Sequence, residues 1–178
     1  MNYYALQVKT RSEDLFITKV TKSLDQEVSN TIRFFFPKKK MPIRKEGKTK
    51  WEICPIFPGY IFLETEDLDT SISKHPIYWA TRTTPGFYRF LPISQEPKPL
   101  EGRDLATLQH FLSFGALAEQ SKVMFDENDR IKVIEGPLKG LEGRIIKVDK
   151  RKKRARIQLD MYEKSFHIDL AFEILGQE

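Results

Sequence analysis

The sequence has little of the chemistry that disulfides, metal centres or active sites require. Cys54 is the only cysteine among 178 residues, which excludes an internal disulfide. The three histidines, His75, His110 and His167, are isolated from one another and from Cys54, so no zinc-ligand spacing is present. No nucleophile–base pair is evident, and the glycines at 136 and 140 are not followed by the Lys-Ser/Thr of a phosphate-binding P-loop. We therefore expect a protein that is not an enzyme and carries neither metal nor cofactor.

Long hydrophobic runs and a secretion signal are also missing. No apolar stretch approaches the roughly 20 residues that a membrane-spanning helix needs. The N-terminus, MNYYALQVKTRSEDLF, lacks a basic segment followed by an apolar one. A single free thiol suits a reducing compartment. These features predict a cytoplasmic protein with no membrane partner, and we expect it to be a monomer.

Positive charge is present in moderate excess and is concentrated in two segments. The formal net charge is +5, from 30 Lys and Arg against 25 Asp and Glu. Residues 37–50 hold seven basic residues and one acid, and residues 150–156 hold six basic residues and no acid. The remainder of the chain is near balance. Clusters of this kind are compatible with a polyanionic partner.

The first 114 residues read as an α+β domain. Aromatic and β-branched residues predict strands at residues 3–8, 31–36, 51–57 and 60–65, and a further strand after the Pro-Gly turn at 85–86. Ser12 precedes two acidic residues, and apolar residues then recur at every fourth position. This pattern predicts a helix that begins at Ser12 as its N-cap. A second helix is expected over residues 103–114. Residues 37–50 lack apolar periodicity and read as a long exposed loop. This order favours an antiparallel sheet with flanking helices.

Residues 115–124 are small and polar and are the best candidate for a linker. The remaining residues, 125–178, contain four short strand-like runs, at 130–134, 143–148, 154–160 and 165–171. Ala155, Ile157 and Leu159 alternate with polar residues, as on a strand with one buried face. Closely spaced runs of this kind predict a small antiparallel β-barrel, near the lower size limit for independent folding.

Three glycines punctuate this second half, at 136, 140 and 143. Gly136 before Pro137 suits a turn with an unusual φ, and Gly140 and Gly143 would allow the chain to reverse and pass close to a neighbour. An ordinary β-turn in a small barrel would explain them equally well. Taken with its surroundings, the segment DRIKVIEGPLKGLEGRIIKVDKRKKRARIQL resembles the KOW motif, which implies an SH3-like barrel.

The N-terminal half indicates which KOW family is involved. The segment YYALQVKTRSED resembles the opening strand and helix start of the NusG N-terminal (NGN) domain. FPGYIFLE and TTPGFYRFL resemble two later segments of the same domain, in the same order. The chain therefore resembles the NusG family of transcription elongation factors over nearly its whole length. The implied domains are an NGN polymerase-binding domain at 1–114, a linker at 115–124 and a KOW RNA-binding barrel at 125–178.

This resemblance implies a polymerase-binding surface. NGN domains dock on the clamp helices of the RNA polymerase largest subunit, and Tyr3, Phe57 and Tyr60 fall on the corresponding surface. Aromatic anchors suit such a dock, although these residues could equally belong to the core. Thr70 and Ser71 lie near the positions at which specialised members of the family carry hydroxyl residues. In those members the hydroxyl residues contact a second element of the polymerase.

The resemblance also implies two nucleic-acid surfaces. The basic segment at 37–50 corresponds to a region that faces upstream DNA, so we expect phosphate contacts there, unless it is a solvated loop. The expected residues are Lys38, Lys39, Lys40, Arg44 and Lys45. The second basic segment would bind nascent RNA as a structured hairpin, the alternative again being a solvated turn. The expected RNA-binding residues are Lys139, Arg144, Lys147, Lys150, Arg151, Lys152, Lys153, Arg154 and Arg156.

One difference from housekeeping NusG bears on which subgroup of the family this chain resembles. Housekeeping NusG carries an Ile-Phe-Gly-Arg-type segment that contacts Rho and a ribosomal protein, whereas this chain has MYEK at Met161–Lys164. Glu163 in place of the glycine should disturb a tight apolar contact and argues against Rho and ribosome coupling. The sequence looks more like the LoaP group, processive antiterminators that act on selected operons. Housekeeping NusG and a ribosome-associated KOW protein remain the two alternatives.

Overall fold

The chain forms two compact units in the computed structural model, which describes residues 1–66, 71–162 and 164–176. The first, here the N-terminal unit, joins Met1–Phe36 to Phe57–Leu105. The second, here the barrel unit, joins Pro37–Ile56 to the chain from Ala106 onward. No helix within the described ranges is long and apolar enough to cross a membrane. Each unit is described separately below.

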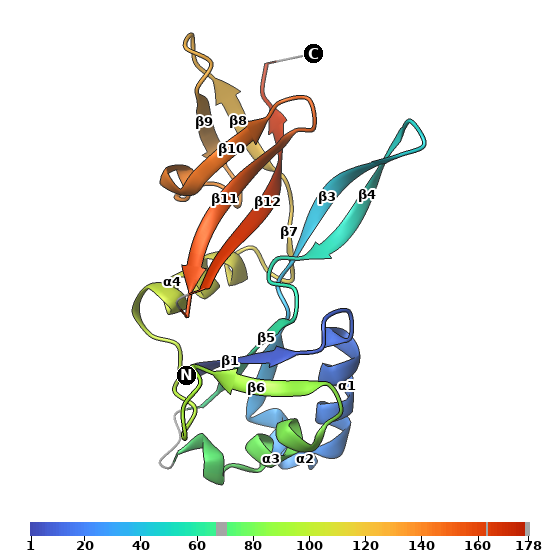
Figure 1. The fold of residues 1–178 in the computed structure, drawn as a ribbon, viewed down its shortest axis with the longest axis vertical. Helices are drawn as coiled ribbons and strands as arrows, with labels where there is room; N and C mark the ends of the chain where they lie inside the picture. Colours follow the sequence, from blue (N-terminus) through green and yellow to red (C-terminus); the bar gives the residue numbers. More distant parts are fainter. Residues whose placement is uncertain (67–70, 163, 177–178) are drawn as a thin grey trace. The chain divides into compact units, whose positions relative to one another are not determined.

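The N-terminal unit is an antiparallel sheet with helices, as the sequence predicts. Its strand order is β2-β5-β1-β6, and every neighbouring pair is antiparallel (Figure 1). The strands are β1 (Asn2–Val8), β2 (Ile32–Phe35), β5 (Tyr60–Thr65) and β6 (Phe87–Leu91). The helices are α1 (Glu13–Ser23), α2 (Gln26–Asn30), η1 (Ile72–Lys74) and α3 (Pro76–Thr83). Helix α3 was not expected from the sequence.

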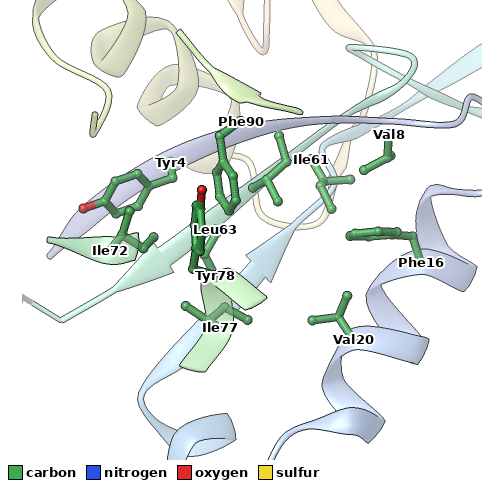
Figure 2. Packing of buried hydrophobic residues seen from close by; sticks show 11 residues of the cluster. Tyr4, Val8, Phe16, Val20, Ile61, Leu63, Ile72, Ile77, Tyr78 and Phe90 are labelled. Atoms are coloured by element: carbon green, nitrogen blue, oxygen red, sulfur yellow. The ribbon is translucent and has the colours of Figure 1, made fainter. Parts of the chain in front are cut away.

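The core of this unit lies between one face of the sheet and the helices. Alternate residues of β1 and β5 point to this face, and Phe16 and Val20 of α1 meet them there (Figure 2). Helix α3 and β6 close the cluster with an aromatic pair, Tyr78 and Phe90, whose ring centroids are 5.5 Å apart. The period of two on the strands and of about four on α1 therefore produces one continuous core.

The start of α1 differs from the sequence prediction. Ser12 occupies the N-cap position but makes no side-chain hydrogen bond to the helix. The next residue, Glu13, is instead buried, and its Oε1 accepts a hydrogen bond from the backbone N–H of Gly59 at 2.8 Å. Gly59 has a φ of +80°, and an added Cβ would lie 3.0 Å from the Thr10 Oγ1. Glu13 therefore anchors the Pro58–Gly59 turn that precedes β5.

The barrel unit contains the predicted C-terminal strands in a curled five-stranded sheet like a small barrel. Its order is β10-β11-β12-β8-β9. Neighbouring strands are antiparallel except β12 and β8, which are parallel, so the expectation of a wholly antiparallel barrel was wrong. The strands are β8 (Ser121–Phe125), β9 (Ile131–Glu135), β10 (Ile145–Asp149), β11 (Arg154–Met161) and β12 (Lys164–Ile174). A short η2 (Glu142–Arg144) precedes β10, and α4 (Gly102–Leu112) leads into the unit.

The basic segment at 37–50 is a β-hairpin, so the prediction of a long loop was wrong. Strands β3 (Lys38–Lys45) and β4 (Lys48–Pro55) pair antiparallel around the turn at Glu46–Gly47 (Figure 1). β3 also pairs in parallel with the two-residue β7 (Leu117–Ala118). The segment expected as a linker thus contains β7 and the start of β8. Cross-strand pairing stabilises a hairpin whose own sequence lacks a clear apolar alternation.

The three glycines of the KOW-like segment have different reasons to be glycine. Gly136 has a φ of +99°, and an added Cβ would lie 2.6 Å from the Ser121 Cα. Gly140 has a φ of +82° but faces open space. Gly143 has neither a positive φ nor a close neighbour, so the close approach expected there was wrong. Only Gly136 is required by both backbone conformation and packing.

Candidate nucleic-acid interface

A basic pocket lies on the barrel unit, on the outer face of β10, β11 and β12. Its volume is about 80 Å³. Four basic side chains and two carboxylates line it: Lys147, Lys152, Arg154, Arg156, Asp149 and Asp169. The excess of cations gives the pocket a net positive charge, which would favour an anion. This group is called the basic pocket below.

The strand pattern explains why these side chains meet. On β11, Ala155 and Ile157 are fully buried, so Arg154, which precedes them, and Arg156, which lies between them, point outward. The pairing register aligns Arg156 with Lys147 of β10 on one side and with Asp169 of β12 on the other. One row of outward residues therefore crosses three strands. The β10–β11 turn adds Lys152 at the end of the row.

Asp169 organises the arginines. Its carboxylate accepts hydrogen bonds from the Arg156 Nε at 2.6 Å and Nη2 at 3.1 Å. The Arg154 Nη1 lies 3.7 Å from the Asp169 Oδ2. The hydrogen bonds from Arg156 lower the pKa of Asp169, because they favour the ionised carboxylate. Asp169 is therefore charged at neutral pH and fixes the Arg156 guanidinium in a bidentate geometry.

The turn at the other end of the pocket is held by Asp149. Its Oδ1 accepts a hydrogen bond from the backbone N–H of Lys152 at 2.9 Å, and this contact lowers the pKa of Asp149. Lys153, the fourth residue of the turn at 150–153, has a φ of +50°. The turn therefore has a defined shape, in spite of its cluster of like charges.

The β3–β4 hairpin reaches the same cluster from within the barrel unit. The Lys39 Nζ donates a hydrogen bond to the Asp169 carbonyl oxygen at 2.6 Å. The Arg154 Nη2 donates to the Pro42 carbonyl oxygen at 3.0 Å. Burial lowers the pKa of Lys39 to about 8, an effect that Asp169 only partly opposes. The buried Arg154 Nε finds no hydrogen-bond partner among the described residues.

The structure brings together four of the nine residues predicted to bind RNA, namely Lys147, Lys152, Arg154 and Arg156. Arg151 and Lys153 are exposed in the adjacent turn, and Arg144 is exposed in η2. Lys150 pairs with Asp129 and lies 3.9 Å from the Phe125 ring centroid, and Lys139 donates to the Val133 carbonyl oxygen. An RNA-binding role for these nine residues stays a prediction. Asp149, Asp169 and Lys39 are pocket neighbours that the sequence did not assign to it.

The five residues predicted to contact upstream DNA are divided between the two faces of the hairpin. Lys38, Lys40 and Arg44 alternate with Lys39 and Lys45 along β3. Lys40 lies 3.3 Å from Glu119, with its Nζ 5.5 Å from the Trp51 ring centroid. Lys45 pairs with Glu52 at 2.8 Å, whereas Arg44 is exposed. DNA contact by this set stays a prediction, and Arg44 and Lys45 are its exposed members.

The residues predicted to contact polymerase have different environments. Phe57 is fully buried and packs edge-on against Phe62, with ring centroids 5.8 Å apart, and Tyr60 is 7% exposed. This burial agrees with the core interpretation of both residues, and no polymerase contact through them is proposed below. Ser71 is exposed, and its hydroxyl lies 3.0 Å from that of Ser73. Thr70 lies outside the described residues, as does Glu163 of the MYEK segment.

Tyr3 is half-buried and has polar neighbours. Its hydroxyl donates to the Glu64 Oε2 at 2.5 Å, and this hydrogen bond raises the pKa of Tyr3 to about 12. The pairing of β1, β5 and β2 places Tyr3, Glu64 and Arg33 in one row across the sheet. The Tyr3 ring also lies 6.2 Å from the Phe35 ring. This row lies on the sheet face opposite the core of Figure 2, since Tyr4 and Leu63 point into the core.

Comparison with known proteins assigns the family. The sequence model described as "Transcription termination factor nusG" matches residues 1–109, more than half of the chain. The chain belongs to the NusG family. A second model, the KOW motif, matches residues 127–160, which contain the basic pocket's β10 and β11. The family and the fold expected from the sequence are thus confirmed.

Individual relatives align with this NusG-family chain over nearly its full length. A "Transcription termination/antitermination protein NusG" from Helicobacter pylori (strain J99 / ATCC 700824) is 24% identical over 176 residues, 97% of this chain and 96% of that protein. The protein of the same name from Bacillus subtilis (strain 168) is 24% identical, over 96% of this chain and 95% of that protein. The solved structure titled "Domain interaction in Thermotoga maritima NusG" covers 96% of this chain and 93% of its own, with a TM-score of 0.58 and 20% identity. This likeness supports the fold.

Proposed function

We propose that this NusG-family protein is a transcription elongation factor that binds RNA polymerase and reads a structured RNA through its barrel unit. Recruitment by such an RNA would restrict its action to selected operons, where it promotes processive antitermination. The observation that carries this proposal is the basic pocket, with four cations gathered over one face of the KOW-motif strands. No chemical step is involved.

The geometry of the pocket suits a phosphate group. Arg156 is already held in a bidentate geometry by Asp169, which leaves its outer edge oriented toward the pocket. Arg154, Lys147 and Lys152 line the same pocket and add three further cations. Phosphate contacts position a protein on nucleic acid without reading its sequence, and A-form RNA is recognised largely by shape and phosphates. A folded RNA hairpin, with phosphates arranged at fixed spacing, is therefore the favoured ligand.

The direct test is binding of the full chain to labelled structured RNA, followed by charge reversal in the pocket. Lys147→Glu with Lys152→Glu should weaken binding at least tenfold and flatten its salt dependence, since about two phosphate contacts are lost. Arg130→Glu with Lys132→Glu is the matched control, because both residues are exposed in the same unit, neither lines the pocket and neither is among the predicted RNA-binding residues. Equal loss in both pairs would indicate only general attraction to a basic protein. No binding by the wild-type chain would reject RNA reading.

For polymerase, we propose contact through the row that contains Tyr3, because an aromatic ring there is accessible and ordered by Glu64. Tyr3→Ser should reduce recovery of bacterial core polymerase on the immobilised protein. Tyr88→Ser is the control, since Tyr88 is 59% exposed on β6 of the same unit. Equal recovery with both variants would place the contact elsewhere.

A contribution of the hairpin to upstream DNA is proposed with Arg44 as the main contact. Arg44→Ala should reduce the affinity of the full chain for elongation complexes carrying an upstream duplex. The same variant should leave affinity unchanged when the upstream duplex has been removed. Equal effects on both complexes would contradict a DNA contact.

Housekeeping activity is a second candidate, and one observation favours it. The relatives aligned above carry the name "Transcription termination/antitermination protein NusG" and match over 95% or more of their length. Co-purification of Rho or a ribosomal protein, lost in Tyr162→Ala, would support this role. Binding to neither, together with RNA binding, would support the specialised role.

A further inference from the structure

The β3–β4 hairpin contributes a buried cation to the rear of the basic pocket. Lys39 belongs to the hairpin, yet its Nζ is bonded to the main chain of Asp169, whose carboxylate lines the pocket. Arg154 makes the reverse connection, from the barrel to the Pro42 carbonyl oxygen of the hairpin. The hairpin and the pocket therefore each contribute a side chain that donates a hydrogen bond to the main chain of the other.

Charge in this cluster is unbalanced when the hairpin is docked. Arg154 and Arg156 pair with the Asp169 carboxylate, and Lys39 donates a hydrogen bond to the carbonyl oxygen of the same residue, so three cations lie around Asp169. Docking thus places a partly desolvated ammonium group among like charges, which opposes docking. An anion bound in the pocket would offset that repulsion.

We infer that RNA phosphate bound in the basic pocket and docking of the β3–β4 hairpin stabilise each other, through Lys39. This inference rests on the RNA-binding function proposed above and specifies how RNA would act on the protein. RNA then does more than recruit the factor: it fixes the basic hairpin against the barrel. Since linkage is reciprocal, the docked hairpin raises affinity for RNA by the same factor.

Mutual stabilisation is favoured over competition by the kind of contact that the hairpin makes. The acceptors for Lys39 and Arg154 at this junction are two main-chain carbonyl oxygens, of Asp169 and Pro42. A phosphate is an acceptor and cannot replace either one. It would use the basic side chains that line the pocket and leave both carbonyl contacts in place.

The sole cysteine provides a built-in reporter of hairpin docking. Cys54 lies on β4, directly opposite Lys39 in the pairing register, and is only partly exposed. The rate at which a thiol reagent labels Cys54 therefore depends on how often the hairpin leaves the barrel. No engineered probe is needed, because the chain has no other thiol.

The experiment measures Cys54 labelling in the full chain, with and without saturating concentrations of an RNA hairpin that gel shift shows to bind. RNA should slow labelling on the order of tenfold, the effect expected for unit charges roughly 8–10 Å apart at an effective dielectric of about 20 with partial salt screening. Lys39→Met should abolish the RNA effect on labelling and weaken RNA binding by a similar factor. Lys39→Arg, which keeps the charge, should retain both.

Lys50→Met is the matched control, because Lys50 is an exposed lysine of the same hairpin. It should leave the RNA effect on labelling intact. RNA that binds but leaves Cys54 labelling unchanged, or accelerates it, would overturn the coupling and leave the RNA-binding function standing. Absence of RNA binding by the wild-type chain would instead reject the function on which the coupling rests.

Discussion

The sharpest physical prediction concerns Lys39 and pH. Its pKa is lowered from the ordinary 10.5 to about 8, chiefly because docking of the hairpin removes the ammonium group from water. In the unfolded chain Lys39 holds its proton up to about pH 10.5, whereas the folded chain loses it near pH 8. The unfolded state therefore binds more protons between these values, so the stability of the barrel unit rises with pH across this window.

The magnitude follows from the size of the shift. One pKa unit corresponds to about 1.4 kcal/mol, so the charged Lys39 costs the folded state about 3 kcal/mol at neutral pH. About 2 kcal/mol of this cost should disappear between roughly pH 7 and pH 9.5. Lys39→Met removes the titrating group, so its stability should lack this rise. At neutral pH the variant should be at least as stable as the wild type, because the lost hydrogen bond is worth only about 1 kcal/mol.

The assay is urea unfolding at several pH values, followed by tryptophan fluorescence. Trp51 lies on the hairpin of the barrel unit, and Trp79, the other tryptophan, lies on α3 of the N-terminal unit. A Trp79→Phe background leaves one reporter in the relevant unit, and Trp79 is 61% exposed, so the replacement should be mild. The quantity compared is the slope of the unfolding free energy against pH, in the chain with Lys39 and in the Lys39→Met variant. Because other lysines and tyrosines titrate equally in both, equal slopes would refute the burial of a charged Lys39.

Three further predictions concern the turn, Tyr3 and Asp169. Gly136→Ala should cost about 3 kcal/mol or more of barrel stability, because the added Cβ would meet the Ser121 backbone. Gly140→Ala is the control and should cost only about 1 kcal/mol, because Gly140 faces open space. Equal urea midpoints for the two variants would refute the packing argument. The raised pKa of Tyr3, about 12, means that its folded state keeps a proton that the unfolded state loses above about pH 10, so its contribution to stability should fall between pH 10 and pH 12. Tyr3→Phe should remove the highest step from the ultraviolet phenolate titration, and an unchanged curve would exclude the Glu64 hydrogen bond. Asp169→Asn should lower barrel stability by about 2 kcal/mol, since a bidentate ion pair is lost, yet raise RNA affinity because a pocket anion is removed; a folded variant with weaker RNA binding would count against the pocket.

Much of the fold could be predicted from the sequence, because local patterns there agree with tertiary packing. The alternation around Ala155 and Ile157 predicts β11 and correctly turns Arg156 outward. Of the hairpin at 38–55, the sequence predicts only part of β4, through the strand expected at 51–57. Five of the eight residues of β3 are basic, and this strand gains its order from pairing with β4 and with β7, which is distant in the sequence. The charged residues of this segment therefore led to the prediction of a loop, whereas cross-strand pairing makes the segment a strand.

The candidate site, like the fold, could be predicted from the sequence only in part. The basic cluster was visible as composition, and four of its members do line one pocket. The roles of Asp169 and Lys39 depend on strand register and on a hairpin that lies 130 residues away in the chain, so no local pattern signals them. The burial of Phe57 and Tyr60 likewise depends on tertiary packing, which the aromatic motif alone does not reveal.

Single-round transcription by purified bacterial RNA polymerase tests the central claim most directly. The template would carry a leader that encodes an RNA hairpin bound by the protein, followed by an intrinsic terminator. We expect the wild-type chain to raise read-through only when the hairpin is encoded, Lys147→Glu with Lys152→Glu to remove this increase, and Arg130→Glu with Lys132→Glu to preserve it. Read-through that is independent of the hairpin, or equal with the pocket variant, would contradict an RNA-directed elongation factor.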